Sequence, residues 1–228
     1  FGQILSTRPD VVGPELAMQL RVLQDKLPAF PVADARREVE AELGRPVDQL
    51  FSEFSPPVAA ASLAQVHRAR VADTGEEVAV KVLRPGIERA FQTDIDAFYL
   101  AANMVEMFLP GSRRLRPMEV IEHFEGVVMG ELDLRLESAA ASEFEATTAK
   151  DDGFSVPRVH WGLSGRRVMT LGWAEGIPAN EVEQIVAAGH DRIELGTRVL
   201  QMFLNHALRD GYFHADMHQG NLKISPTG

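Results

Sequence analysis

Hydrophobic residues recur at helical spacing along much of the chain. Between Pro14 and Leu27, four leucines stand at positions i, i+4, i+7 and i+11, which predicts an amphipathic helix that Pro14 begins and Pro28 ends. A second helix is predicted from Asp34 to Leu43, and Gly44 can supply its left-handed C-terminal cap. Further helices are expected over Val47–Phe54, Ile87–Leu109, Pro117–Lys150, Glu181–Ala188 and Asp191–Arg209.

Strand patterns interrupt these helices at two places. Gln65–Val71 and Val78–Leu83 are rich in β-branched and apolar residues and flank the turn-forming stretch 72–77, which predicts an antiparallel hairpin. Two more strands are expected at Arg158–Trp161 and Arg167–Leu171. This order of helices, a small antiparallel sheet and further helices indicates an α+β fold, and it does not match a series of βαβ units.

Composition narrows the class of protein. The chain has 228 residues, of which 45% are hydrophobic and 25% charged, so it can bury a sizeable core in one large or two small domains. Its net charge of −10 argues against a non-specific nucleic-acid binder, and the lack of cysteine excludes disulfides, thiolate zinc sites and a cysteine nucleophile. Without a run of about 18 apolar residues, no transmembrane segment is expected. A start at Phe1 instead of methionine indicates an incomplete reading frame.

Lys81 closes the strand sequence Val-Ala-Val-Lys. Alternation along a strand puts Lys81 on the face opposite to Val78 and Val80. Two interpretations stay open for the residue alone: it is a solvated lysine of an edge strand, or its ammonium points into a cleft and binds phosphate. The motif is similar to the V-A-I-K strand of protein kinases, which favours the second.

The segment His214–Asn221 follows a helix stop at Gly211 and is expected to be a loop. Asp216 and Asn221 are five residues apart, which is the spacing of the kinase catalytic loop, where a carboxylate orients the acceptor proton and an amide oxygen holds Mg²⁺. Ordinary turn chemistry is one alternative. The other is a metal site made by His214, Asp216 and His218.

A run of small residues, Ala59-Ala60-Ala61-Ser62, precedes the predicted hairpin. Kinases place a glycine-rich loop at this point so that backbone amides can approach phosphate. Alanine restricts the backbone more than glycine does. The run by itself would therefore be interpreted as a turn of small residues.

Taken together, these segments resemble the UbiB/AarF/ADCK family of atypical protein-kinase-like proteins over nearly the whole chain. The segment Phe1–Asp10 is similar to the family's K-x-G-Q segment without its lysine, and residues 57–68 are similar to its alanine-rich nucleotide loop. Glu131-Leu132-Asp133 is similar to the E-x-D motif, and residues 214–221 are similar to the H-A-D-P-H-P-G-N loop. The pieces occur in the family's order, and their conjunction is far more specific than any one of them.

The resemblance implies an α+β, atypical protein-kinase-like fold. Its parts would be a helical N-terminal extension over residues 1–55, an N-lobe over residues 56–175 and the start of the C-lobe over residues 176–228. The N-lobe would hold a small antiparallel sheet, a helical insertion and a long helix. The C-lobe would be truncated, and its first part would carry the catalytic loop.

The resemblance also implies the roles of individual residues. Lys81 and Asp216 would be catalytic, with Lys81 on the α- and β-phosphates of ATP, and Asn221 would bind Mg²⁺. Lys81 would pair with the region of Glu131, and Asp133 and Glu137 stay open as alternative partners. The predicted nucleotide-binding residues are Ala59, Ala60, Ala61, Ser62, Lys81, Glu131 and Asp133. For the acidic residues, a solvated helix face paired with Arg135 is the competing interpretation.

The implied function is that of an ATP-binding kinase or ATPase that supports isoprenoid-quinone biosynthesis, of ubiquinone or menaquinone, or lipid homeostasis. The alternatives are a small-molecule kinase like the aminoglycoside or choline kinases, and a nucleotide-dependent scaffold with negligible turnover. Expected partners are ATP, a lipid or quinone precursor and quinone-biosynthesis enzymes, in the cytoplasm or at the inner face of the membrane through parts outside this chain.

The chain departs from the family pattern at a few positions. Met217 and Gln219 replace the two prolines of the loop, and Gly172 stands where relatives often carry an acidic residue. No D-F-G sequence, which would supply a magnesium-binding carboxylate, follows the loop before Gly228. The 228-residue chain made alone is therefore expected to lack turnover.

Overall fold

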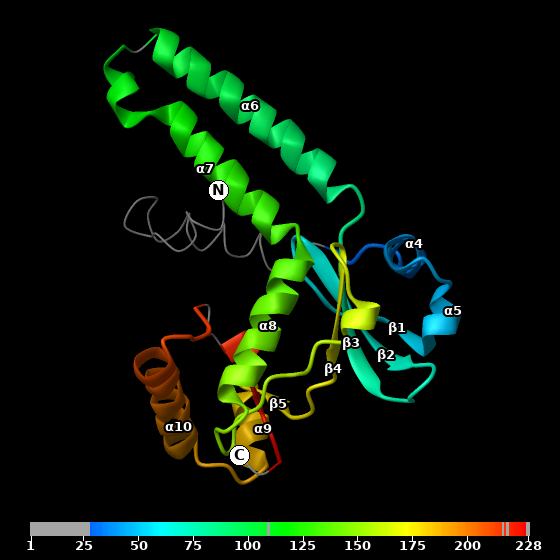
Figure 1. Ribbon diagram of the computed structural model, residues 1–228. Coiled ribbons are helices and arrows are strands. Elements are labelled where there is room, and N and C mark those ends of the chain that lie inside the picture. Colours follow the sequence, from blue (N-terminus) through cyan, green and yellow to red (C-terminus); the bar gives the residue numbers. More distant parts are fainter. Residues whose placement is uncertain (1–27, 109, 216, 218, 227–228) are drawn as a thin grey trace. The chain divides into compact units, whose positions relative to one another are not determined.

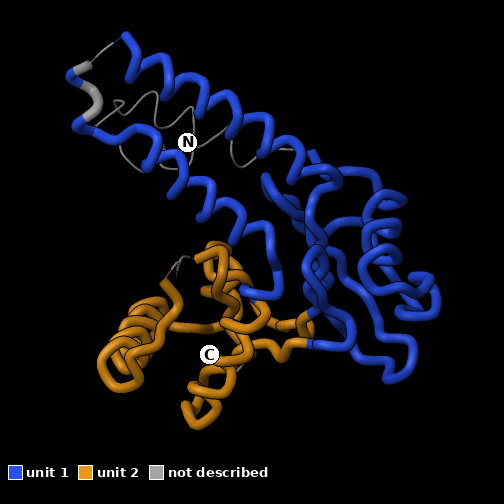
Figure 2. The backbone as a smooth tube through the Cα atoms, turned by 45° about the horizontal axis from the view of Figure 1, so that its top comes forward, with its two compact units in different colours: residues 1–137, 160–170 blue, residues 138–159, 171–228 orange. Residues whose placement is uncertain are grey.

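The structure is a computed structural model that describes residues 28–108, 110–215, 217 and 219–226 (Figure 1). The chain divides into two compact units, coloured separately in Figure 2: one contains residues up to 137 and 160–170, and the other contains 138–159 and 171 onward. The predicted helix Pro14–Leu27 and the segment Phe1–Asp10 lie outside the described residues. The predicted boundaries at residues 55 and 175 separate an N-terminal extension, an N-lobe and a C-lobe, and this division stays a prediction.

A four-stranded sheet forms the centre of the first unit. Its strands follow one another in the order β1-β2-β3-β4, and β2 pairs antiparallel with both β1 and β3. The strands are β1 (Phe51–Ala60), β2 (Ala64–Val71), β3 (Glu77–Leu83) and β4 (Val168–Gly172). The predicted hairpin is confirmed as β2 and β3, and its turn contains Gly75 in the left-handed region at φ 72°.

Two helices, α4 (Val32–Leu43) and α5 (Val47–Leu50), contribute to the hydrophobic core of this unit. Ala35 and Val39, one turn apart on α4, are fully buried together with alternate valines of β3. Gly44 ends α4 in the left-handed region, as predicted, and its N–H donates to the carbonyl of Glu40. The core therefore occupies one face of the sheet, and the side chains between the buried valines belong to the opposite face.

Two buried polar residues of β2 form hydrogen bonds that hold the segment before α4 and the β1 strand in place. The amide of Gln65 bonds both the N–H of Phe30 (3.0 Å) and its carbonyl (3.3 Å), and it also donates to Nε2 of His67 at 2.9 Å. Nδ1 of His67 then donates to the carbonyl of Ser55 at 2.8 Å. Burial lowers the pKa of His67 below its ordinary value, which keeps the ring neutral in this network.

The expected short helix Val47–Phe54 is wrong beyond Leu50, because the chain turns into β1 at Phe51. The sequence does not predict this strand because it contains Ser55, Pro56 and Pro57. Proline cannot donate to a sheet ladder and is tolerated in strands only at an edge or a bulge. β1 meets both conditions, since it is an edge strand and its register with β2 shifts on both sides of Pro57.

A helical hairpin connects β3 to the rest of the chain. α6 (Ile87–Phe108) and α7 (Pro117–Glu131) lie side by side (Figure 1), joined by a stretch that contains the 3₁₀ turn η1 (Pro110–Leu115). Tyr99 of α6 donates to Glu125 of α7 at 2.8 Å, and the rings of Phe98 and Phe124 meet edge to face. The hairpin confirms the predicted helix Ile87–Leu109 as far as Phe108.

The predicted single helix Pro117–Lys150 is wrong, because the structure breaks it at Leu132 and Asp133 into α7 and α8 (Leu134–Thr148). Leu132 is fully buried and leaves helical geometry. Asp133 then accepts a hydrogen bond from the N–H of Arg135 at 3.1 Å, which caps the new helix. The first N–H of α8, that of Leu134, donates to the carbonyl of Arg166.

The second unit contains α9 (Val182–Ala187), α10 (Arg192–Asn205) and a two-stranded sheet of β5 (Ile177–Pro178) and β6 (Lys223–Ile224). Asp191 caps α10 through its side chain, and the chain continues from α10 through a π-helical turn over 206–210 that ends at Gly211. The expected strand Arg158–Trp161 is reduced to a single bridge between Val159 and Leu171. Among the described residues, no helix is long and apolar enough to cross a membrane.

Candidate functional site

Lys81 lies on the sheet face opposite to the core that α4 and α5 share. Its neighbours in β3, Val80 and Val82, are fully buried, so alternation turns Lys81 to the other side. The register pairs Ala59 with Val66 and Val66 with Lys81. Residues directly opposite each other share a face, so this register forms one row from the alanine-rich end of β1 to the lysine.

The ammonium of Lys81 is held by the carboxylate of Glu137 in α8. Nζ lies 2.8 Å from Oε1 and 2.6 Å from Oε2, and the side chains are 32% and 49% exposed respectively. An ion pair that is this accessible to water stabilises a protein by only about 0.2–1 kcal/mol. The pair is therefore important because it fixes the position of the ammonium. The interpretation of Lys81 as a solvated lysine without a partner is wrong.

The region predicted to pair with Lys81 contains its partner, but the two motif residues Glu131 and Asp133 do not supply it. Glu131 is the exposed last residue of α7. Asp133 caps α8 and pairs with Arg135, whose Nη2 lies 2.6 Å from Oδ2. The hydrogen bond from Arg135 lowers the pKa of Asp133. Asp133 thus begins the helix that carries Glu137 one turn later. Aspartate is a common N-cap residue, so the sequence could have indicated a helix start at this position.

The alanine-rich run divides between a strand and a turn. Ala59 and Ala60 end β1, whereas Ala61 and Ser62 enter the tight connection to β2, which the N–H of Ala61 closes on the carbonyl of Ala64 at 2.8 Å. Ala61 and Ser62 are exposed. The register brings Ala59 into the row of Lys81, so strand pairing places one end of the run near the lysine.

The loop with the predicted catalytic residues is described only in part. Asp216 and His218 lie outside the described residues, so the predicted role of Asp216 and the alternative metal site stay untested. Asn221 ends the 3₁₀ turn η4 (Gln219–Asn221), two residues before β6 begins at Lys223.

The segment that leads into this loop is fixed by a charged network that the sequence analysis missed. Buried His206 bonds Oδ2 of Asp151 through Nε2 at 3.0 Å, and Arg209 bonds the same oxygen at 2.8 Å. Hydrogen bonds from Arg209 first, and then from His206, lower the pKa of Asp151. Tyr212 donates to the carbonyl of Ala140 in α8 at 3.2 Å. Within the second unit, the chain that enters the loop is therefore anchored to α8 and the residues after it.

The stretch after β4 contacts β6 at several points. Nζ of Lys223 donates to the carbonyl of Ala174 at 2.6 Å and lies 4.7 Å from the centre of the Trp173 ring. Gly176 has φ 126°, and a Cβ there would stand 2.5 Å from the carbonyl oxygen of Ile224. Only glycine fits this approach of β5 to β6.

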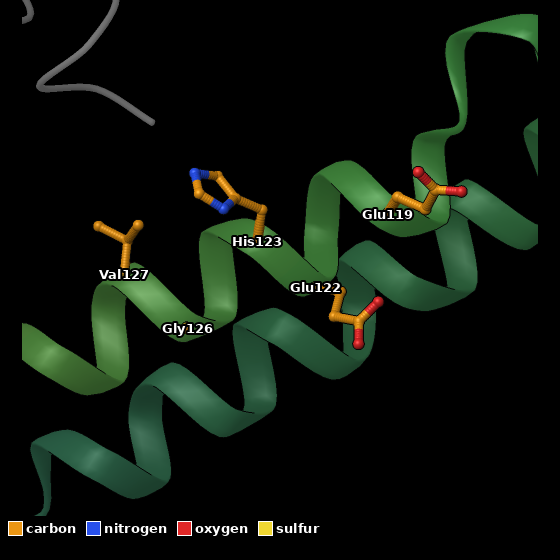
Figure 3. A pocket seen from close by; sticks show the side chains of 5 residues that line it. All are labelled: Glu119, Glu122, His123, Gly126 and Val127. Atoms are coloured by element: carbon orange, nitrogen blue, oxygen red, sulfur yellow. The ribbon is translucent and has the colours of Figure 1, made fainter.

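A separate hollow lies along α7, shown in Figure 3. Its lining residues come from a single helix and are Glu119, Glu122, His123, Gly126 and Val127. Among the described residues, no three His, Asp or Glu side chains are grouped as a metal ion would require. The hollow therefore carries no argument for a metal site.

Comparisons with known proteins identify the family of this chain. The sequence model of the ABC1 atypical kinase-like domain matches residues 22–228. A curated protein from Marinobacter nauticus named "Probable protein kinase UbiB" is 40% identical over 225 residues, which cover 98% of this chain and 41% of that protein. A protein of the same name from Aliivibrio fischeri strain MJ11 is 40% identical over 227 residues, 99% of this chain and 42% of its own length. This chain thus spans about two fifths of these curated relatives.

A solved structure is similar over most of the chain. It is described as the complex structure of Rv3197-erythromycin from Mycobacterium tuberculosis, and it superimposes with a TM-score of 0.67 at 30% sequence identity. The match covers 99% of this chain and 56% of that one.

Proposed function

Because the chain belongs to the family of ABC1 atypical kinase-like domains, we propose that it binds ATP at the sheet face that carries Lys81 and forms part of an ATP-dependent phosphotransferase or ATPase. The family and the kinase-like fold confirm the resemblance seen in the sequence. ATP binding, turnover and the biological role are the parts that we propose.

The observation that carries the proposal is the pair of Lys81 and Glu137. A lysine ammonium binds phosphate as a point charge, and a carboxylate that holds it from one side fixes its position without removing its charge. Kinases use such a pair, between a β3 lysine and a helix glutamate, to hold the phosphates of ATP. Lys81 ends a row that begins at Ala59, so the alanine-rich turn and the lysine belong to the same part of the sheet.

In this proposal each predicted residue has a separate task. Lys81 binds the α- and β-phosphates, and the backbone of the Ala59–Ser62 segment approaches them. Asp216 accepts or orients the proton of the attacking group, by its place in a loop with kinase spacing. Glu137 replaces Glu131 as the partner of the lysine, and the cap geometry of Asp133 favours a structural task for that residue.

Mg²⁺ accompanies ATP in kinase-like proteins, and the residues described here do not by themselves form a site for it. Asn221 offers one neutral amide oxygen, whereas Mg²⁺ requires charged oxygen ligands. Among the described residues there is no group of three His, Asp or Glu side chains to supply them. The prediction that Asn221 binds Mg²⁺ stays a proposal, and no step depends on it here.

For the biological role we propose support of isoprenoid-quinone biosynthesis, because the curated relatives carry the name UbiB. The implied partners are ATP, a lipid or quinone precursor and the enzymes of that synthesis, with peripheral attachment to the inner face of the membrane. The aminoglycoside- or choline-kinase alternative is not favoured by the family match. A nucleotide-dependent scaffold is the second candidate.

Steady-state ATP hydrolysis by the full-length protein distinguishes the enzyme from the scaffold. We expect Mg²⁺-dependent turnover in the natural protein and its loss in an Asp216→Asn variant that still binds ATP. Binding without turnover in the natural protein would favour the scaffold, and absence of both would refute the proposal. The same assay on the 228-residue chain tests the prediction that this chain alone is inactive.

A further inference from the structure

Arg84, the residue directly after β3, contacts the turn between β1 and β2 at three successive peptide groups. Its backbone N–H donates to the carbonyl of Leu63 at 2.7 Å. Its side chain reaches the two preceding carbonyls, from Nε to Ser62 at 3.3 Å and from Nη2 to Ala61 at 3.5 Å. One residue therefore orients three consecutive peptides of the alanine-rich turn.

The orientation of these carbonyls fixes the opposite side of each peptide. A trans peptide is planar, and its N–H points away from its C=O. With the carbonyls of 61, 62 and 63 directed at Arg84, the N–H groups of residues 62, 63 and 64 are directed away from it. Successive N–H groups that face one side form an anion-binding surface.

We propose that Arg84 is a positioning residue that holds the alanine-rich turn in the orientation needed to bind the phosphates of a nucleotide. This inference rests on the proposed function, because it assigns the turn N–H groups to the same ligand as Lys81. It extends that function to a residue whose guanidinium is engaged by protein carbonyls and reaches the ligand only through the turn.

An arginine suits this task better than another cation. The guanidinium is a planar fork with five N–H donors, so one side chain can bond carbonyls in several directions, whereas a lysine ammonium is a compact point charge. Arg84 uses this property a third time, because Nη2 also donates to the carbonyl of Pro28 at 3.1 Å. The guanidinium carbon lies 5.4 Å from the centre of the Phe30 ring, within the range of a cation–π contact.

These contacts connect the turn to the chain that enters the first unit. Gln65 bonds both backbone groups of Phe30, and Arg84 bonds the carbonyl of Pro28 two residues before it. The guanidinium of Arg84 thus bonds both the turn and the segment that enters the first unit. A change in the path of residues 28–30 would alter the support of the turn, and with it the placement of the N–H groups.

The test measures the affinity of the full-length protein for ATP and for adenosine in four single variants. Arg84→Gln removes the cation and most of the fork, Arg84→Lys keeps the charge without the fork, and Lys81→Met removes the proposed phosphate contact. Arg37→Gln, on the exposed side of α4, is the matched control for loss of one arginine charge. Melting temperatures of all variants accompany the titrations.

We expect both Arg84 variants to bind ATP about tenfold more weakly, the effect of one or two weakened hydrogen bonds to a charged ligand, while adenosine affinity changes less than about twofold. Full ATP affinity in Arg84→Lys would overturn the inference, because charge alone would then suffice. Equal losses for ATP and adenosine would overturn it as well, because the effect would be structural only. Unchanged ATP affinity in Lys81→Met, whatever Arg84 does, would instead refute the proposed function.

Discussion

Replacement of Asp133 separates two roles that the sequence leaves open, a nucleotide ligand and a helix cap. In the structure its carboxylate accepts the N–H of Arg135 at the start of α8 and also pairs with the guanidinium of that residue. Asp133→Ala removes both contacts. Loss of an N-cap side chain costs about 1 kcal/mol, and the exposed ion pair adds little to this value.

Asp133→Asn is the matched variant, because asparagine caps helices as well as aspartate does but lacks the charge. We therefore expect the free energy of unfolding to fall by about 1 kcal/mol in Asp133→Ala and by much less in Asp133→Asn, measured by urea denaturation at pH 7. The hydrogen bond from Arg135 lowers the pKa of Asp133, so its contribution is present above the pKa of the unfolded chain. It is lost as the pH falls through the lowered pKa of the folded state.

Nucleotide affinity gives the second measurement on these variants. A cap that only supports Glu137 predicts weakened ATP binding in Asp133→Ala and nearly natural binding in Asp133→Asn. If asparagine weakens ATP binding as much as alanine does while stability is kept, Asp133 acts through its charge on the ligand. The capping account would then be wrong.

Two further predictions concern stability. Burial lowers the pKa of His67, so the unfolded chain takes up a proton below about pH 6.5 that the folded protein does not. The free energy of unfolding should therefore fall between pH 7.5 and 5.5. Urea titrations at these two pH values should show a smaller fall in His67→Asn. An equal fall in the variant would contradict the assignment. Gly176→Ala should lower the melting temperature, because its Cβ would meet the carbonyl of Ile224 at 2.5 Å, whereas Gly196→Ala, with open space in α10, should raise stability by up to about 1 kcal/mol. A Gly176→Ala variant as stable as the natural protein would show that the close approach of Gly176 is wrongly placed, and a destabilised Gly196→Ala variant would contradict the open space at that position.

The sequence predicts those parts of the fold in which local pattern and tertiary packing agree. The β2–β3 hairpin combines β-branched strands with a turn-forming stretch, and α4 combines an apolar stripe with Gly44 at its end. β1 escapes such a prediction because its prolines oppose strand formation locally. The sheet accepts them because β1 is an edge strand with register shifts.

The sequence predicts which type of site the chain contains, but not which residues contact each other in it. The strand pattern identifies Lys81, and the acidic stretch 131–137 contains its partner. The choice of Glu137 depends on the break at Leu132, which resets the helix direction before the glutamate. Contacts of Arg84 and Gln65 with distant backbone groups leave no periodic signal, since they depend on where the chain returns in space.

The affinity of the full-length protein for ATP, compared between Lys81→Met and Lys150→Met, tests the central claim most directly. Lys81 pairs with Glu137 in the candidate site, whereas Lys150 is an exposed lysine in the turn that follows α8. Both variants lose one positive charge, and the half-exposed pair of Lys81 should change the free energy of unfolding by no more than about 1 kcal/mol. The account predicts that Lys81→Met lowers ATP affinity at least tenfold while Lys150→Met leaves it unchanged. Equal affinities in the two variants, with both proteins folded, would contradict it.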